Sequence, residues 1–151
     1  MKNCYLFFIG DINDKALKRA INKSPNKHRI IATGFRKDAR HISGSLDVFV
    51  LPSIKREGLP RSVIEAMSQG VPAIVSDAGG SPEVVEHGKT GFVVAAGDAS
   101  AITAAVENIL SNPSQYAEFS LASKERVSTT FSINQTVSKT LCLYKELLGM
   151  K

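Results

Sequence analysis

Short apolar runs and amphipathic stretches alternate along this chain from beginning to end. The apolar runs are of strand length and occupy residues 5–9, 29–33, 48–51, 71–76 and 92–94. Between them, apolar residues recur every three or four positions, which predicts helices. Strands that alternate with helices are typical of a parallel sheet with helices on both faces. The pattern therefore predicts one α/β domain.

Several predicted helices have clear signals at their ends. A helix over residues 60–69 has Pro60 at its first helical position and Gly70 just beyond its last residue. Ser81 is expected to cap a short helix, and Asp98 to cap the first of three helices that complete the chain. Breaks between these three helices are expected at residues 112–113 and 131–132.

Composition agrees with one globular domain of 151 residues, since 43% of the residues are hydrophobic and 22% are charged. No apolar run approaches the roughly 20 residues that span a bilayer. Residues 4–9 are too few for a signal peptide and have no cleavage site after them, so we expect a buried strand there. Cys4 and Cys142 lie in apolar contexts, which predicts buried thiols in a reducing compartment and a cytoplasmic protein.

The net charge of +5 and the pI near 9.3 favour anionic partners. Nucleotide phosphates, an acidic membrane surface and nucleic acid all satisfy that condition. The basic residues among the first 40 positions are scattered, without the interleaved aromatic residues of a nucleic-acid platform. A solvated basic face is therefore expected, and nucleic acid is not an expected partner.

The loop after the third predicted strand leads directly into a helix. Ligands of open parallel sheets bind beyond the carboxyl ends of the strands, which here are the loops at residues 34–38, 53–59 and 77–80. Because Pro60 has no N–H group, the unpaired donors of the first helical turn are expected to be the amides of Arg61, Ser62 and Val63. Free amides and the positive end of a helix dipole form a phosphate site.

Two carboxylates flank this predicted phosphate site. Glu57 precedes the turn, and Glu65 lies inside the helix on the same face as Arg61. One hypothesis is that Glu65 accepts hydrogen bonds from a pair of sugar hydroxyls. The alternative is that Glu65 pairs with Arg61 one turn earlier and that Glu57 is a solvated loop residue. Spacing alone leaves both open.

The motifs in this region resemble glycosyltransferase family 4. Two glutamates separated by seven residues are the signature of that family, and further matching segments occupy residues 47–53, 57–60, 65–67, 70–72 and 79–83. The resemblance continues through residues 88–94 and reaches Tyr144, so it covers nearly the whole chain. It implies a Rossmann-like domain that forms the donor-nucleotide-binding half of a GT-B fold.

The resemblance also implies roles for individual residues. Glu65 would bind the ribose hydroxyls of a nucleotide sugar, and Glu57 a hydroxyl of the transferred hexose. Backbone amides in the turn between them would hold the sugar and the diphosphate, and the matching positions are Gly58, Leu59, Arg61 and Ser62. The loop after the second strand would lie against the base, which makes Phe35 and Arg36 candidates beside the alternative of ordinary loop residues. The expected substrate is a UDP or GDP sugar, with no cofactor.

Family members carry two features that we do not find before Tyr5. One is an N-terminal acceptor-binding domain, and the other is a βα segment whose arginine and lysine neutralise the leaving diphosphate. Lys55 or Arg56 could substitute in part, or could face solvent. We therefore expect the chain by itself to be inactive and assign no catalytic residue. Transfer in this family retains the anomeric configuration and needs no metal, and His28, His41 and His87 are isolated in the sequence.

The resemblance leaves two functions open. The first is the donor half of a hexosyltransferase that acts on a glycan or lipid-linked acceptor in polysaccharide biosynthesis, with peripheral association at the inner membrane face. The second is a non-catalytic GT-B-like interaction subunit, or one half of a split enzyme, which would expose an apolar patch. An oxidoreductase is disfavoured because no Gly-x-Gly-x-x-Gly follows a strand.

Overall fold

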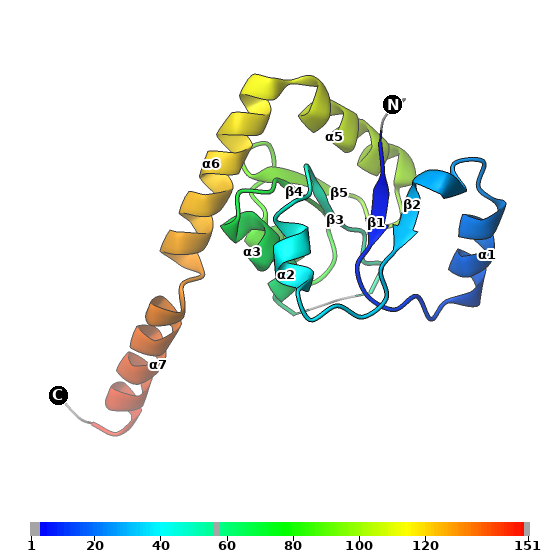
Figure 1. The fold of residues 1–151 in the computed structure, drawn as a ribbon. Helices are drawn as coiled ribbons and strands as arrows, with labels where there is room; N and C mark the ends of the chain where they lie inside the picture. Colours follow the sequence, from blue (N-terminus) through cyan, green and yellow to red (C-terminus); the bar gives the residue numbers. More distant parts are fainter. Residues whose placement is uncertain (1–3, 56–57, 150–151) are drawn as a thin grey trace. The chain divides into compact units, whose positions relative to one another are not determined.

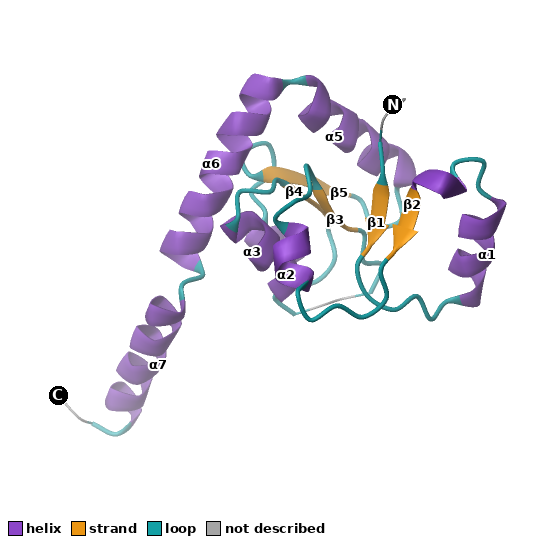
Figure 2. Cartoon of the chain, viewed as in Figure 1, coloured by secondary structure: helices purple, strands orange, loops and turns teal. Residues whose placement is uncertain are grey.

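A computed structural model describes residues 4–55 and 58–149 of the chain. The chain forms two compact units, an N-terminal unit, Met1–Ile42, and a C-terminal unit, Ser43–Lys151. Figure 1 labels the helices and strands, and Figure 2 colours them by type. Glu57 and Arg56 lie outside the described residues, so the predictions for these two side chains are not tested.

The N-terminal unit contains a pair of parallel strands. Its elements are β1 (Leu6–Phe8), α1 (Lys15–Lys23), a 3-10 turn (Lys27–Arg29), β2 (Ile30–Ala32) and the greater part of α2 (Ala39–Ser43). Leu6 of β1 is opposite Ile30 of β2. The carboxylate of Asp14 begins α1, because Oδ1 accepts the amides of Ala16 at 2.6 Å and Leu17 at 3.0 Å.

The apolar run of β1 is not buried, contrary to the expectation from its composition. Tyr5 is 59% exposed and Leu6 is 48% exposed. The reason is that β1 pairs with one short strand and that α1 contains no buried residue, so within the described part of the N-terminal unit no helix buries the apolar run. Cys4 beside it and Cys142 in the last helix are exposed free thiols, which corrects the prediction of buried cysteines.

The C-terminal unit is built around three parallel strands in the order β3-β4-β5. Its elements are β3 (Phe49–Leu51), α3 (Arg61–Ser68), β4 (Ala73–Ser76), α4 (Ser81–Val84), β5 (Gly91–Val94), α5 (Ala99–Ser111), α6 (Pro113–Thr130) and α7 (Ile133–Leu147). Phe49 pairs with Ala73, and Ala73 pairs with Gly91 across the central strand. The five strands among the described residues thus form two parallel sheets rather than one.

The core of the C-terminal unit has two parts, which together bury both faces of β4. Val63 and Met67 of α3 pack with Val75 of β4, in a cluster that also contains Ala73, Val84 and Val85. Ile74 of β4 packs instead with Ala105, Ile109 and Phe119 from α5 and α6. Because successive residues of a strand point to opposite faces, helices cover both sides of the central strand. The predicted α/β class is confirmed.

The observed ends of the helices confirm some predictions and correct others. Asp98 caps α5 by accepting the amide of Ala101 at 2.9 Å, and Gly70 ends the turn after α3 with φ of +84°. Ser81 is the first residue of α4 rather than its cap, and its hydroxyl is buried without a partner among the described residues. Pro60 is the cap of α3, with ψ of 101°, rather than its first helical residue.

The last helix, α7, contains no buried residue. Its large apolar side chains are half or more exposed, and they are Ile133, Val137, Leu141, Leu143, Tyr144 and Leu147. None of the helices that the structure describes is long and apolar enough to cross a membrane.

Candidate functional site

The first turn of α3 presents free backbone donors. Pro60 has no side-chain group with which to cap the helix, and its carbonyl accepts the amides of Val63 at 3.2 Å and Ile64 at 3.3 Å. The amide of Val63 is therefore paired, contrary to prediction, because Pro60 stands one position before the helix. The amides of Arg61 and Ser62 have no acceptor among residues 4–55 and 58–149. This helix end can bind an anion with two donors and the helix dipole.

Glu65 lies one turn further along the same face of α3. Its Oε1 is 3.7 Å from a terminal nitrogen of Arg61, so the predicted pairing within the helix is present. That distance is too long for a hydrogen bond, and the Arg61 side chain is 89% exposed against 39% for Glu65. An exposed pair of this kind is worth only a few tenths of a kcal/mol. Glu65 can therefore exchange this contact for hydroxyl groups of a ligand at little cost.

The backbone before Pro60 is held closely against the start of α4. Gly58 and Leu59 are exposed, and Leu59 retains 46% of its accessible surface. A Cβ atom added to Gly80 would lie 2.8 Å from the carbonyl oxygen of Gly58. The φ of Gly80 is −84°, which any residue adopts, so glycine is required here for space and not for conformation. The position of Gly58 thus depends on where α4 begins.

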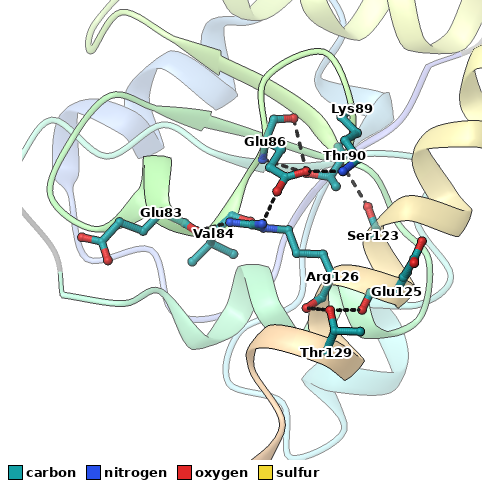
Figure 3. Close-up of polar contacts among 9 residues, drawn as sticks. All are labelled: Glu83, Val84, Glu86, Lys89, Thr90, Ser123, Glu125, Arg126 and Thr129. Carbon is teal, nitrogen blue, oxygen red and sulfur yellow. Dashed lines mark hydrogen bonds and ion pairs between the residues drawn. The ribbon is translucent and has the colours of Figure 1, made fainter. Parts of the chain in front are cut away.

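The other end of α4 is fixed by Arg126 of α6 (Figure 3). Its Nε donates to the carbonyl of Val84 at 2.7 Å, and a terminal nitrogen donates to the carbonyl of Glu83 at 2.6 Å. The other terminal nitrogen bonds the carboxylate of Glu86. These carbonyls belong to the last turn of α4, where helical carbonyls otherwise lack partners. Arg126 therefore fixes the last turn of α4, the short helix that begins just after Gly80.

The Glu86 carboxylate links Arg126 to the turn before β5. Lys89 donates to it from Nζ at 3.0 Å, and this bond, with the nearby Arg126 charge, holds the pKa of Glu86 below its usual range. The hydroxyl of Thr90 accepts the Glu86 amide at 2.9 Å, and Ser123 donates to the carbonyl of Thr90 at 3.2 Å (Figure 3). Hydrogen bonds and ion pairs therefore tie α4, the turn and α6 into one network.

Sequence inspection did not identify Arg126 as part of the support for this site. The partners of its guanidinium lie 40 or more positions away in the sequence, and those on Glu83 and Val84 are backbone carbonyls, which leave no trace in a motif. A local signal is the position of this cation near two residues that pack against the core, Val127 in α6 and Phe131 just after its end. The Arg126 guanidinium lies 5.6 Å from the ring centre of Phe131.

The candidates for base contact, Phe35 and Arg36, belong to the N-terminal unit. The amide of Phe35 donates to Asp11 at 3.1 Å, and its side chain is 73% exposed. Asp38 accepts two hydrogen bonds from Arg36, both at 2.7 Å, and this pairing lowers the pKa of Asp38. An open cavity of about 450 Å³ lies at the carboxyl ends of β1 and β2, where it is lined by Gly10, Asp11 and Gly34, among others. Contact of Phe35 or Arg36 with a base remains a prediction.

Lys55 is exposed, and a contribution from it to neutralising the leaving diphosphate stays a prediction. Nδ1 of His87 lies 3.2 Å from the amide of Val93, and the ring packs edge-on against Phe92. His87 therefore stabilises the turn before β5. Among the residues that the structure describes, no group of histidine, cysteine, aspartate and glutamate side chains could hold a metal ion.

A parallel sheet with an anion-binding helix end beyond the carboxyl end of a strand is a feature of many nucleotide-binding proteins. Comparison with known proteins defines the class. A family model described as glycosyl transferases group 1 matches residues 1–126. The amylovoran biosynthesis glycosyltransferase AmsK of Erwinia amylovora is 29% identical over 130 residues, which are 82% of this chain and 32% of AmsK.

Two further relatives agree. The lipopolysaccharide core biosynthesis mannosyltransferase LpcC of Rhizobium leguminosarum is 31% identical over 121 residues, covering 80% of this chain and 34% of LpcC. The crystal structure of HepE from Anabaena, solved with UDP and also with UDP-glucose, is 26% identical. It superposes with a TM-score of 0.84 in the UDP complex, over 92% of this chain and 41% of HepE.

The chain belongs to the glycosyl transferases group 1 family. It spans about a third of the length of the curated relatives it matches, since the covered shares of AmsK and LpcC are 32% and 34%.

Proposed function

We propose that this chain is the donor-nucleotide-binding part of a glycosyltransferase of family 4, with a GT-B architecture. The complete enzyme moves a hexose from a UDP or GDP sugar to a glycan or lipid-linked acceptor in polysaccharide biosynthesis. The observation that supports this most is the end of α3, where the amides of Arg61 and Ser62 have no acceptor among the described residues and the partly exposed Glu65 lies one turn further along the helix. The complexes of HepE with UDP and UDP-glucose support the same ligand class.

In this proposal each part of the helix end has its own task. The two amides and the helix dipole bind the diphosphate, where negative charge develops as the sugar leaves. Glu65 accepts hydrogen bonds from the ribose hydroxyls, and this replaces its weak contact with Arg61. Gly58 and Leu59 lie next to the transferred sugar, and Glu57 is proposed to bind one of its hydroxyls.

The chemical step is proposed to be metal-independent and to retain the anomeric configuration. The chain alone is proposed to be inactive, because the acceptor and the cations that neutralise the leaving phosphate would be bound by another domain. If this is right, a complete enzyme built on this domain keeps its activity in EDTA, and NMR of the product shows the anomeric configuration of the donor. An inverted product, or activity restored only by a divalent cation, contradicts this part of the proposal.

The phosphate site can be tested by removing one amide while the helix is kept intact. Arg61→Pro is suited to this, because Pro60 already has the extended ψ of 101° that a following proline requires, and proline is favoured at the first helical position. Arg61→Ala is the matched control, since it removes the same side chain and keeps the amide.

Binding of UDP, GDP and ADP is measured by calorimetric titration. We expect one of the nucleotides to bind the unmodified chain, and its affinity to be about tenfold weaker for Arg61→Pro than for Arg61→Ala. Equal affinities for the two variants would show that the amide of residue 61 does not bind the nucleotide. Failure of all three nucleotides to bind contradicts the proposed function.

A second candidate function is a non-catalytic interaction subunit. The observation that favours it is α7, whose large apolar side chains from Ile133 to Leu147 are exposed. Such a subunit would bind a partner through α7 and would not require Glu65. Nucleotide binding that depends on Glu65 therefore separates the two candidates.

A further inference from the structure

Charge is distributed very unequally between the two units. Residues 1–42 contain ten lysines and arginines against three aspartates, which gives a formal charge of +7. Residues 43–151 contain nine lysines and arginines against eleven acidic residues, which gives −2. The basic character of the whole chain therefore comes entirely from its N-terminal unit.

The clearest concentration of this charge is on α1. Lys15, Lys18, Arg19 and Lys23 fall on one side of the helix, and all four are exposed. None of them takes part in an ion pair among residues 4–55 and 58–149. Four unpaired cations within nine residues repel one another, so a helix face of this kind is stabilised by an anionic partner.

The opposite side of α1 is apolar and only partly covered. Ala16, Leu17, Ala20 and Ile21 occupy it, none of these residues is buried, and Leu17 is 36% exposed. A strongly amphipathic helix with cations on one face and low overall hydrophobicity is typical of helices that lie at a membrane surface.

We propose that the N-terminal unit binds the surface of a bilayer rich in anionic phospholipids, with the cations of α1 on the headgroup phosphates. A lipid surface fits better than nucleic acid, because α1 contains no aromatic residue on which a base could stack. This proposal concerns a different unit from the nucleotide site at α3 and does not depend on it.

The test uses the full chain and sedimentation with vesicles of two compositions. One composition is phosphatidylcholine alone, and the other contains phosphatidylglycerol at about one third of the lipid. Arg19→Gln/Lys23→Gln removes two cations from α1. Lys139→Gln/Lys145→Gln is the matched control, since it removes two exposed cations from α7, one of them also in the last turn of its helix.

The chain is expected to sediment with the anionic vesicles and not with the neutral ones, and to be released by about 1 M salt. Each cation removed from α1 should weaken binding about fivefold, so the α1 pair should weaken it about 25-fold while the α7 pair changes it little. Binding of both variants with equal affinity would overturn the assignment to α1. Absence of vesicle binding, equal binding to neutral vesicles, or tighter binding to single-stranded RNA at the same salt concentration would overturn the proposal itself. UDP titration without vesicles should give the same affinity for the α1 pair and the unmodified chain, which keeps this test separate from that of the nucleotide site.

Discussion

The two units of this protein differ in how much of their apolar surface they bury. In the C-terminal unit the central strand β4 is completely buried, and the two clusters around it take residues from α3, α4, α5 and α6. In the N-terminal unit none of the described residues up to Ile42 is buried. The helix end proposed to bind phosphate is therefore built on a packed core, whereas the loop of Phe35 belongs to a unit without one. Precise positioning of a ligand requires the first kind of support.

The difference in packing can be tested by truncating one apolar side chain in each unit. Met67→Ala should lower the free energy of unfolding by about 2–5 kcal/mol, because Met67 is completely buried between α3 and the sheet. Leu17→Ala in the N-terminal unit should cost clearly less, since Leu17 already retains 36% of its surface. Urea unfolding measures both. Similar losses for the two variants would contradict the contrast in packing.

A second substitution, Gly80→Ala, should cost less stability than Met67→Ala and should act on the candidate site rather than on the core. Gly80→Ala places a methyl group 2.8 Å from the carbonyl oxygen of Gly58, so the two segments must separate. We expect stability to fall by about 1–3 kcal/mol, as is usual for overpacking, and UDP affinity to fall as the loop before α3 moves.

Gly88→Ala is a useful comparison for Gly80→Ala. It adds the same methyl group in open space, although at φ of +75°, where an L residue is strained. It should therefore destabilise the chain without changing the affinity for UDP. An unchanged affinity in Gly80→Ala would show that Gly80 does not position the loop.

The smallest expected effect is a dependence of stability on pH through Glu86. The pKa of Glu86 is lowered in the folded chain from a usual value of 4.5, first by its bond with Lys89 and then by the charge of Arg126. A lowered folded pKa means that the stabilisation is complete above pH 4.5 and is lost as the pH falls through the folded pKa.

Glu86→Gln should therefore have a lower Tm than the unmodified chain at neutral pH, and the difference should disappear as the pH falls below 4.5 and through the lowered pKa. Thermal unfolding followed by circular dichroism over this range measures the effect. A difference in Tm that stays constant with pH would show that the charge of Glu86 does not contribute.

The alternation of apolar runs and amphipathic stretches correctly predicted the α/β class and the position of every described strand to within a few residues. It failed for the burial of β1, because an apolar run does not reveal whether a second layer covers it. Residues 5–9 have the composition of a core strand, yet Tyr5 and Leu6 are half exposed. Burial depends on contacts between distant segments, which periodicity alone cannot supply.

The candidate site was predicted in part. The helix end and the pairing of Glu65 with Arg61 followed from local spacing, since helical geometry fixes both. The pairing of the Val63 amide was missed, because it depends on a shift of one residue in where the helix begins. Arg126 was missed because its contacts with the carbonyls of Glu83 and Val84 arise only when α6 packs beside α4.

The central claim is that Glu65 binds the ribose of a nucleotide next to the free amides of α3. Calorimetric titration of UDP and GDP into the unmodified chain, Glu65→Ala and Glu107→Ala tests it most directly. Glu107 is an exposed carboxylate on α5 and serves as the matched control. We predict that the better of the two nucleotides binds the unmodified chain and Glu107→Ala equally well, and binds Glu65→Ala about ten- to a hundredfold more weakly. Equal binding by all three proteins, or no binding of either nucleotide, would contradict the account.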